Sequence, residues 1–178
     1  PGLELTAGLS LSREETSGQS FGAPLEESSG VGKADRDEDA VYLQAGFAVG
    51  THRLVAAGRH TDHDTFGGVN TWNLEWGTPL GAAWSATAGI GRGFRAPGTS
   101  DLYAFGGNPD LQPEISRSID FGLKYRPHPD HELGLALFHT EIDDLIEYLD
   151  PDGFLGELPG RNENVGDARI KGAELGWR

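Results

Sequence analysis

Acidic side chains are the residues of this sequence with the clearest chemical potential, and they gather in two polar stretches. Residues 13–39 and residues 143–168 are both dense in Asp and Glu. Carboxylate oxygens are the ligands that Ca²⁺ prefers, so calcium binding is one chemistry that these stretches offer. The candidate ligands are Asp35, Asp37, Asp39, Asp143 and Asp144. Their spacing matches no EF-hand loop, and a plain solvated acidic loop remains the alternative.

Other patterns are weaker signs of chemistry. The segment HTDHD, residues 60–64, resembles a metal cluster, but alternate side chains of a strand point to opposite faces, which favours a solvated strand end. The segment GIGRGF, residues 89–94, has no helix pattern after it, so a phosphate-binding loop is not predicted. No serine lies in a G-x-S-x-G turn, and no nucleophile with a base stands out. We therefore predict no enzymatic activity.

Composition narrows the class of partner. The 178 residues contain 28 Asp and Glu against 14 Lys and Arg, a formal net charge of −14, which argues against a nucleic-acid partner. Cysteine is absent, so disulfides, thiolate zinc sites and thiol nucleophiles are excluded. No apolar run approaches the roughly 18 residues of a transmembrane helix. A barrel strand gives a much weaker hydropathy signal, because its two faces alternate.

Apolar residues recur with a period of two, which is typical of strands with one apolar face. In residues 3–12 the leucines alternate with Glu4, Thr6, Gly8, Ser10 and Ser12. About eight segments show such alternation, at residues 3–12, 41–49, 53–63, 70–78, 83–94, 118–126, 131–142 and 169–178.

The connections between these segments are sorted by length. Short turn segments are GTHR at 50–53, TPLGA at 78–82 and PHPDH at 127–131. Longer polar connections lie at 13–39, 95–117 and 143–168, with a shorter one at 64–70. Alternation of short and long connections predicts an all-β, antiparallel transmembrane β-barrel with short periplasmic turns and long extracellular loops.

A soluble antiparallel β-sandwich with a binding role is the alternative to a membrane barrel. A sandwich would carry many charges on its wet face. Here the polar face consists largely of Gly, Ser and Thr, and large aromatic residues lie on the apolar face, where interfacial girdle residues are expected. These aromatic residues are Trp72, Trp76, Trp84, Tyr125 and Trp177. If Leu74, Phe121 and Leu135 shared an enclosed core, the membrane prediction would fail.

Two ordered blocks resemble the signature region of TonB-dependent outer-membrane receptors. The first runs from GFRAP at 93–97 through DLY at 101–103 to NPDLQPE at 108–114. The second comprises EIDDLI at 141–146 and ENVGDARIKGAE at 163–174. Within that family the chain is most similar to the cobalamin (vitamin B12) transporters, and siderophore receptors share much of the pattern.

The resemblance implies a large barrel of about 22 strands around a plugged lumen. It implies TonB-dependent uptake of cobalamin or a ferric siderophore across the outer membrane of a Gram-negative bacterium. We expect residues 1–178 to be part of one such barrel domain, an internal piece of the wall, because no plug domain or TonB box is visible. TonB would then act only through the missing N-terminal part.

The resemblance also implies that ligand contacts lie in the loop that contains the first block. The candidate ligand-binding residues are Arg95, Asp101, Tyr103, Phe105 and Asn108. Arg95, Lys124, Arg169 and Lys171 are expected near the outer strand ends, where they could meet an anionic ligand or lipopolysaccharide phosphates; pairing with neighbouring loop carboxylates is the alternative. Outer-membrane lipid is an expected partner, and no cofactor is expected beyond calcium in the outer loops. A remaining alternative is a self-contained eight-stranded barrel with a structural or adhesive role.

Overall fold

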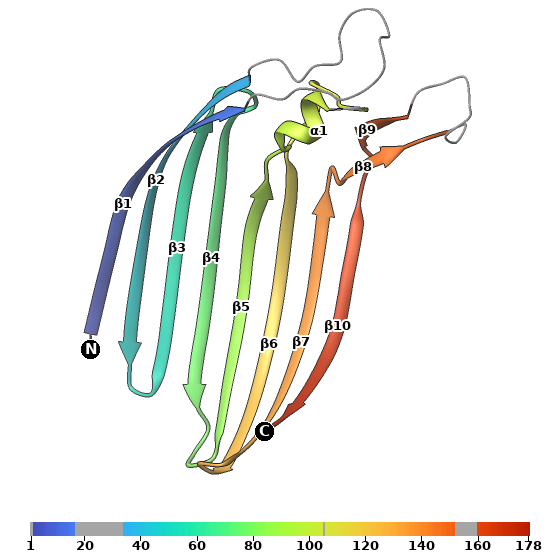
Figure 1. The fold of residues 1–178 in the computed structure, drawn as a ribbon. Helices are drawn as coiled ribbons and strands as arrows, with labels where there is room; N and C mark the ends of the chain where they lie inside the picture. Colours follow the sequence, from blue (N-terminus) through green and yellow to red (C-terminus); the bar gives the residue numbers. More distant parts are fainter. Residues whose placement is uncertain (1, 17–33, 105, 152–159) are drawn as a thin grey trace, which may run out of the picture.

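A single antiparallel sheet of eight long strands makes up most of the computed structural model, which describes residues 2–104, 106–151 and 160–178 apart from 17–33. In chain order the strands are β1 (Gly2–Thr16), β2 (Ala34–Val49), β3 (His52–His63), β4 (Gly67–Pro79), β5 (Trp84–Arg95), β6 (Glu114–His128), β7 (His131–Asp143) and β10 (Ala168–Trp177). Each strand pairs with its neighbour in sequence, giving the order β1-β2-β3-β4-β5-β6-β7-β10 (Figure 1). The prediction of about eight antiparallel strands is therefore confirmed.

The two ends of the sheet differ as the connection lengths predicted. One end, hereafter the turn end, carries the short connections β2–β3, β4–β5 and β6–β7 at the bottom of Figure 1. Gly50 and Gly81 adopt φ values of 60° and 95° in two of these turns, a conformation that glycine adopts without strain. The opposite end, hereafter the loop end, carries the long connections. The connection predicted at 64–70 is shorter, because β4 already begins at Gly67.

Strands β1 and β2 extend further toward the loop end than the apolar alternation indicated. The ladder continues to the pair Thr16 and Ala34, inside the predicted polar loop 13–39. Charged neighbours explain this extension, because the Arg13 guanidinium lies 3.6 Å from Asp35 and 3.7 Å from Asp37 across the two strands. Each cross-strand pair of opposite charge stabilises a sheet by roughly 0.2–1 kcal/mol.

The large apolar side chains lie exposed on one face of the sheet. Leu74 is 50% exposed, Phe121 is 40% exposed and Leu135 is only partly covered, so these residues do not share an enclosed core. Among the described residues the buried apolar side chains are few, and two of them belong to a loop: Ala40, Val69, Ala86, Leu102 and Leu111. Contiguous exposed apolar surface of this extent marks a surface that contacts lipid or another protein.

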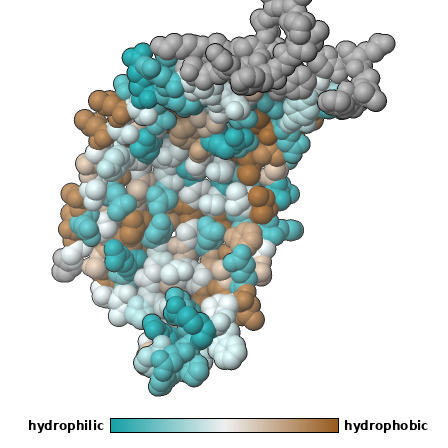
Figure 2. All heavy atoms as spheres, in the orientation of Figure 1, coloured by the Kyte–Doolittle hydropathy of each residue, from teal (hydrophilic) through white to brown (hydrophobic). Residues whose placement is uncertain are grey.

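The opposite face carries small and polar residues. Cross-strand neighbours on it include Glu75, Gly89 and Asp120, and one row further along Asn73, Gly91 and Ser118. In the view of Figure 2 hydrophilic, intermediate and hydrophobic residues mix over the sheet, and a hydrophilic group covers the turn end at the bottom. One apolar and one polar face is the arrangement of a membrane-barrel wall, and it excludes the packed core of a sandwich.

Strands β1 and β10 form the two edges of the sheet within the described residues, so the eight strands do not close on themselves. This arrangement disfavours a self-contained eight-stranded barrel, whose first and last strands would pair. No helix in the described part of the chain is long and apolar enough to cross a bilayer.

Three short elements at the loop end were not predicted. Helix α1 (Thr99–Tyr103) lies in the connection between β5 and β6. Strands β8 (Ile146–Leu149) and β9 (Arg161–Asn164) pair as a separate two-stranded sheet in the connection between β7 and β10. Four-residue strands and a five-residue helix are too short to give a periodic signal.

Candidate ligand site at the loop end

A bidentate ion pair closes the ladder of β5 and β6 at the loop end. Arg95 and Glu114 are the last cross-strand partners, and the guanidinium donates hydrogen bonds of 2.7 and 2.6 Å to the two carboxylate oxygens of Glu114. The Glu114 side chain is only 9% exposed. The hydrogen bonds from Arg95 lower the pKa of Glu114 and outweigh the burial that opposes them. The same bonds raise the pKa of Arg95.

Asp101 joins this pair to the start of helix α1. Its Oδ2 accepts a hydrogen bond of 2.9 Å from the backbone N–H of Gly98 and another of 3.3 Å from Nη1 of Arg95. A carboxylate at the third position of a helix commonly satisfies the amide that precedes the first turn. The side chain of Leu102, which follows, is 2% exposed. Helix α1 is therefore fixed both by its cap and by an apolar anchor.

The two signature blocks of the sequence meet through asparagine side chains. Asn108 is 8% exposed, and its Nδ2 donates to the backbone carbonyl of Asn162 over 2.9 Å. In return the Asn162 backbone N–H donates to the carbonyl of Gly106 (2.7 Å), and its Nδ2 donates to the carbonyl of Asp101 (3.1 Å). Strand β9 is thus hydrogen-bonded along the loop that contains α1.

The Asn164 side chain forms further hydrogen bonds between β9 and the neighbouring loops. Its Oδ1 accepts from the backbone N–H of Gln112 (2.9 Å), while its Nδ2 donates to the carbonyls of Gln112 (3.0 Å) and Asp144 (2.7 Å). Glu114 contributes as well, since its Oε1 accepts from the backbone N–H of Ile146 over 2.8 Å. We call the loop 95–114 together with residues 144–149 and 160–166 the rim unit.

The other side of loop 95–114 is tied to β1 and β2. Nη1 of Arg36 donates to the carbonyl of Pro97 (2.7 Å), and its Nη2 lies 3.4 Å from Glu14. Glu14 also accepts a hydrogen bond of 2.8 Å from the hydroxyl of Thr99. The rim unit therefore spans the sheet from β1 to β10 at its loop end.

Two tyrosine rings project from the rim unit. Tyr103 at the end of α1 is 37% exposed, and Tyr148 on β8 is 47% exposed. The Tyr148 ring lies over Gly106, where an added Cβ would clash with the ring. Gly106 also has a φ of 71°, so glycine is favoured here for two separate reasons. Exposed tyrosines combine a flat apolar ring with a polar hydroxyl, which suits binding of a large organic ligand.

The predicted ligand-binding residues fall into four groups. Tyr103 is exposed, whereas Asn108 is buried and its side chain is engaged within the rim unit. Arg95 and Asp101 are partly exposed but are bonded to each other, and Arg95 is bonded to Glu114 as well. Phe105 lies outside the described residues. Ligand contact by these residues remains a prediction.

Sequence reasoning missed Glu114, Tyr148 and Asn162 as site residues. The asparagines at 162 and 164 are two residues apart, so they point to the same side of β9, and this spacing was the available signal. Tyr148 had no such signal, because its position over Gly106 depends on a contact between distant loops.

The predicted calcium ligands lie in two separate places. Asp35, Asp37 and Asp39 follow one another on one face of β2, with Arg13 near the first two. Asp143 ends β7 and lies 2.9 Å from Arg117. No group of three His, Cys, Asp or Glu side chains suited to a metal ion occurs in the described ranges.

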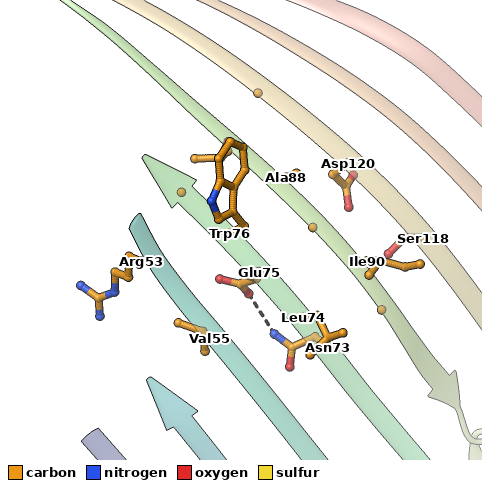
Figure 3. A pocket seen from close by; sticks show the side chains of 15 residues that line it. Arg53, Val55, Asn73, Leu74, Glu75, Trp76, Ala88, Ile90, Ser118 and Asp120 are labelled. Carbon is orange, nitrogen blue, oxygen red and sulfur yellow. Dashed lines mark hydrogen bonds between the residues drawn. The ribbon is translucent and has the colours of Figure 1, made fainter. Parts of the chain in front are cut away.

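The polar face of the sheet is hollowed below the rim unit. A concavity of about 480 Å³ lies over β3 to β6, and polar side chains, glycines such as Gly89 and Gly91, and apolar residues such as Val55 line it together. Figure 3 shows Glu75 and Asn73 of β4, joined by a hydrogen bond of 2.9 Å, between Arg53 of β3 and Asp120 of β6. Such a wall can contact polar protein surface or water.

Comparison with known proteins decides the family. The family profile described as TonB dependent receptor-like, beta-barrel matches residues 2–178. The chain belongs to this family of TonB-dependent receptor barrels.

Named relatives include vitamin B12 transporters. The chain is 32% identical over 177 residues to the vitamin B12 transporter BtuB of Vibrio vulnificus. It is 31% identical over 175 residues to that of Photobacterium profundum. Each alignment covers 98% of this chain and 27% of the relative, so the chain spans about a quarter of the length of these transporters.

Solved structures show the same fold. The siderophore receptor PirA from Pseudomonas aeruginosa superposes with a TM-score of 0.79 at 23% identity, covering 97% of this chain and 32% of that one. A mutant of the ferric enterobactin receptor PfeA from the same organism, in complex with enterobactin, gives a TM-score of 0.79 at 21% identity, covering 97% and 30%. These likenesses confirm the barrel-wall architecture that the alternation predicted.

Proposed function

We propose that this chain forms part of the wall and outer loops of an outer-membrane receptor that takes up a scarce ligand, cobalamin or a ferric siderophore. The observation that carries the proposal is a sheet with one exposed apolar face whose loop end holds a folded, hydrogen-bonded unit. Family membership supports it, and so do the relatives named as vitamin B12 transporters. The loop end would face the outside of a Gram-negative cell.

Uptake by this route requires no covalent chemistry from the wall. Binding would rest on the rings of Tyr103 and Tyr148, with Arg95 and Asp101 as polar neighbours. Phe105 and Asn108 belong to the same loop, where Asn108 would position rather than contact the ligand. Energy would come from TonB acting on a plug domain that sits against the polar face. Calcium held by the acidic loops would be an additional stabilising ligand.

Binding to the complete receptor tests this proposal. Purified receptor in detergent is titrated with cyanocobalamin and, separately, with ferric enterobactin, and affinity is measured by tryptophan fluorescence. Tyr103→Ala and Tyr148→Ala should each weaken binding of the true ligand by about tenfold, since one stacked aromatic ring contributes roughly 0.5–1.5 kcal/mol beyond its buried area. Tyr125→Ala at the turn end, where the ring packs on Trp84, serves as the control and should leave affinity unchanged.

Absence of saturable binding to either ligand class by the folded receptor would defeat the uptake proposal. Unchanged affinity in both tyrosine variants would instead remove the rim unit from the ligand site while leaving the receptor proposal intact.

A further inference from the structure

The outer limit of the apolar face runs obliquely across the sheet. Successive cross-strand partners define one row perpendicular to the strands, and it contains Leu3, Phe47, Leu54, Trp76, Ala88, Phe121, Leu137 and Ala173. From this row the apolar face continues toward the loop end for a different distance on each strand. The last non-polar residues before a polar one are Leu11, Val41, Gly58, Trp72, Ile90, Ile119, Leu137 and Ala173.

This limit falls steadily from β1 to β10. Leu11 lies eight residues beyond the row on β1, Ile90 lies two beyond it on β5, and Ala173 lies on the row itself. Eight residues correspond to ~26 Å along a strand, and the seven steps between eight strands to ~34 Å across the sheet. The limit is therefore inclined by about 38° to the row, within the ~35–45° by which strands tilt in membrane barrels.

The slope identifies the oblique line as the edge of the hydrocarbon layer at the loop end. A flat membrane surface crosses tilted strands at successively lower positions, so the last apolar residues of all eight strands share one depth. Phe94 and Ile115 lie beyond the line, but Phe94 packs edge-on against Phe66 and neither side chain is fully exposed. Residues immediately beyond the line lie at the level of the lipid headgroups.

Basic side chains occupy this level on one half of the sheet. The first polar residues beyond the line are Arg13, Asp39, His60, Asn70, Arg92, Arg117, His139 and Lys171. Each of β5, β6, β7 and β10 thus contributes Arg, Lys or His, and Arg169 follows Lys171 on the same face of β10. We call Arg92, Arg117, His139, Arg169 and Lys171 the basic row.

The basic row keeps an excess of positive charge in a chain with a net charge of −14. Arg117 lies 2.9 Å from Asp143, and Arg169 lies 3.1 Å from Glu141, so two of the four permanent cations are paired. The guanidinium of Arg92 donates to the backbone carbonyl of Asn70. Neither Arg92 nor Lys171 forms an ion pair with any residue that the structure describes. Within that part of the chain, two cations therefore remain without a carboxylate partner.

Arg92 also borders a hollow that could receive a headgroup. The β4–β5 ladder ends at Trp72 and Arg92, and beyond it a concavity of about 550 Å³ lies between the two strands. Its lining includes Phe66, Trp72 and Ile115 beside Arg92, with Asp144 at one side. Asn70 and Gln112 also line the hollow, so its wall is mixed, and a guanidinium among polar and apolar groups can bond a phosphate at the membrane surface.

We propose that the basic row binds phosphate groups of outer-leaflet lipid headgroups and fixes the depth of this wall in the membrane. The proposal relies on the proposed outward orientation of the loop end but not on which ligand is taken up. Arginine and lysine at a membrane surface each contribute about 1 kcal/mol toward anionic lipid. Arg92 and Lys171 are the principal contacts because both lack a carboxylate partner among the described residues.

Lipid retention by the complete receptor tests the proposal. Receptor in a neutral detergent is mixed with lipid A, which carries two phosphates, and bound lipid is counted by native mass spectrometry. The variant R92Q/R117Q/K171Q should retain lipid A on the order of fivefold less tightly for each lost cation. The variant R53Q/K124Q/R126Q, which removes three cations from the polar face and turn end, should bind as the unaltered receptor does.

Several outcomes would overturn it. Equal loss of lipid A from both triple variants would show a general charge effect, and equal binding of dephosphorylated lipid A would remove the phosphate from the interaction. Displacement by millimolar inorganic phosphate would point to a free-anion site instead. Heat-dependent gel mobility of both variants confirms that each is folded before lipid is counted, and ligand titration reports uptake function separately.

Discussion

A single buried carboxylate, Glu114, holds three parts of the loop end together. Its two oxygens accept from Arg95 at the end of β5 and from the backbone of Ile146 at the start of β8. Because the Arg95 side chain is 52% exposed, solvent screens part of this interaction. Glu114 nevertheless has no other way to be satisfied within the described residues, and a buried carboxylate without partners is costly.

Acid should therefore loosen the rim unit. The pKa of Glu114 is lowered from 4.5 in the folded state, so its contribution is complete above about pH 4.5 and is lost as the pH falls through the folded-state pKa. Amide hydrogen exchange of residues 97–113, corrected for the intrinsic pH effect, should rise about fivefold on acidification, for a loss of roughly 1 kcal/mol. In Glu114→Gln it should be raised already at pH 7 and respond less to acid. Glu75→Gln is the matched control. It removes a carboxylate that accepts a hydrogen bond from Asn73 outside the rim unit, so exchange of residues 97–113 should not change.

At the scale of elements, hydrogen bonds join the loop between β5 and β6 to strand β9 of the β8–β9 sheet. The β9 asparagines bond to backbone groups of the facing loop: Asn162 donates to the carbonyl of Asp101, and Asn164 pairs with both backbone groups of Gln112, much as a further strand would. Mutual hydrogen bonding thus accounts for Asn108 and Asn164 in the two signature blocks, and Tyr103 and Tyr148 beside them remain partly exposed.

Removing one asparagine should loosen both connections together. Asn164→Ala deletes hydrogen bonds to both backbone groups of Gln112 and to the carbonyl of Asp144, at a cost of about 2 kcal/mol. Hydrogen exchange should accelerate in residues 106–113 and in 144–149 alike. Glu163→Ala, between the two asparagines and paired with exposed Arg161, should change neither segment. Acceleration confined to residues 161–166 would contradict a single unit.

For the whole molecule, the two faces of the sheet should tolerate charge very differently. Phe121 and Ser118 are three residues apart on β6 and point to opposite faces. Arginine at the middle of the lipid-facing band costs about 2–4 kcal/mol. In the complete receptor Phe121→Arg should abolish heat-dependent gel mobility in most of the population, whereas Ser118→Arg should leave it unchanged. Equal tolerance at both positions would contradict a lipid-facing surface.

The local sequence pattern was sufficient to predict the strands and to predict which face of the sheet is apolar and exposed. Alternation of apolar and polar residues depends only on neighbouring positions, so Leu74 and Phe121 could be assigned to an exposed apolar face from the sequence. The turns at Gly50 and Gly81 were likewise local. The predicted ends of β1 and β2 were wrong because the charged residues beyond Leu11 pair across the two strands, which hydropathy does not register.

Only the tertiary structure decided how the distant loops meet. The partners of Asn108, Glu114 and Tyr148 lie many residues away, and no local pattern encodes which loop will face which. The register of seven strand pairs was also needed to place Ile90 and Ala173 on the same oblique limit of the apolar face. The position of each strand along this limit depends on the summed register of all the strand pairs between them. Short-range periodicity determined the wall and its two faces, whereas hydrogen bonds between residues far apart in sequence determined the rim unit and the slope of the apolar limit across the sheet.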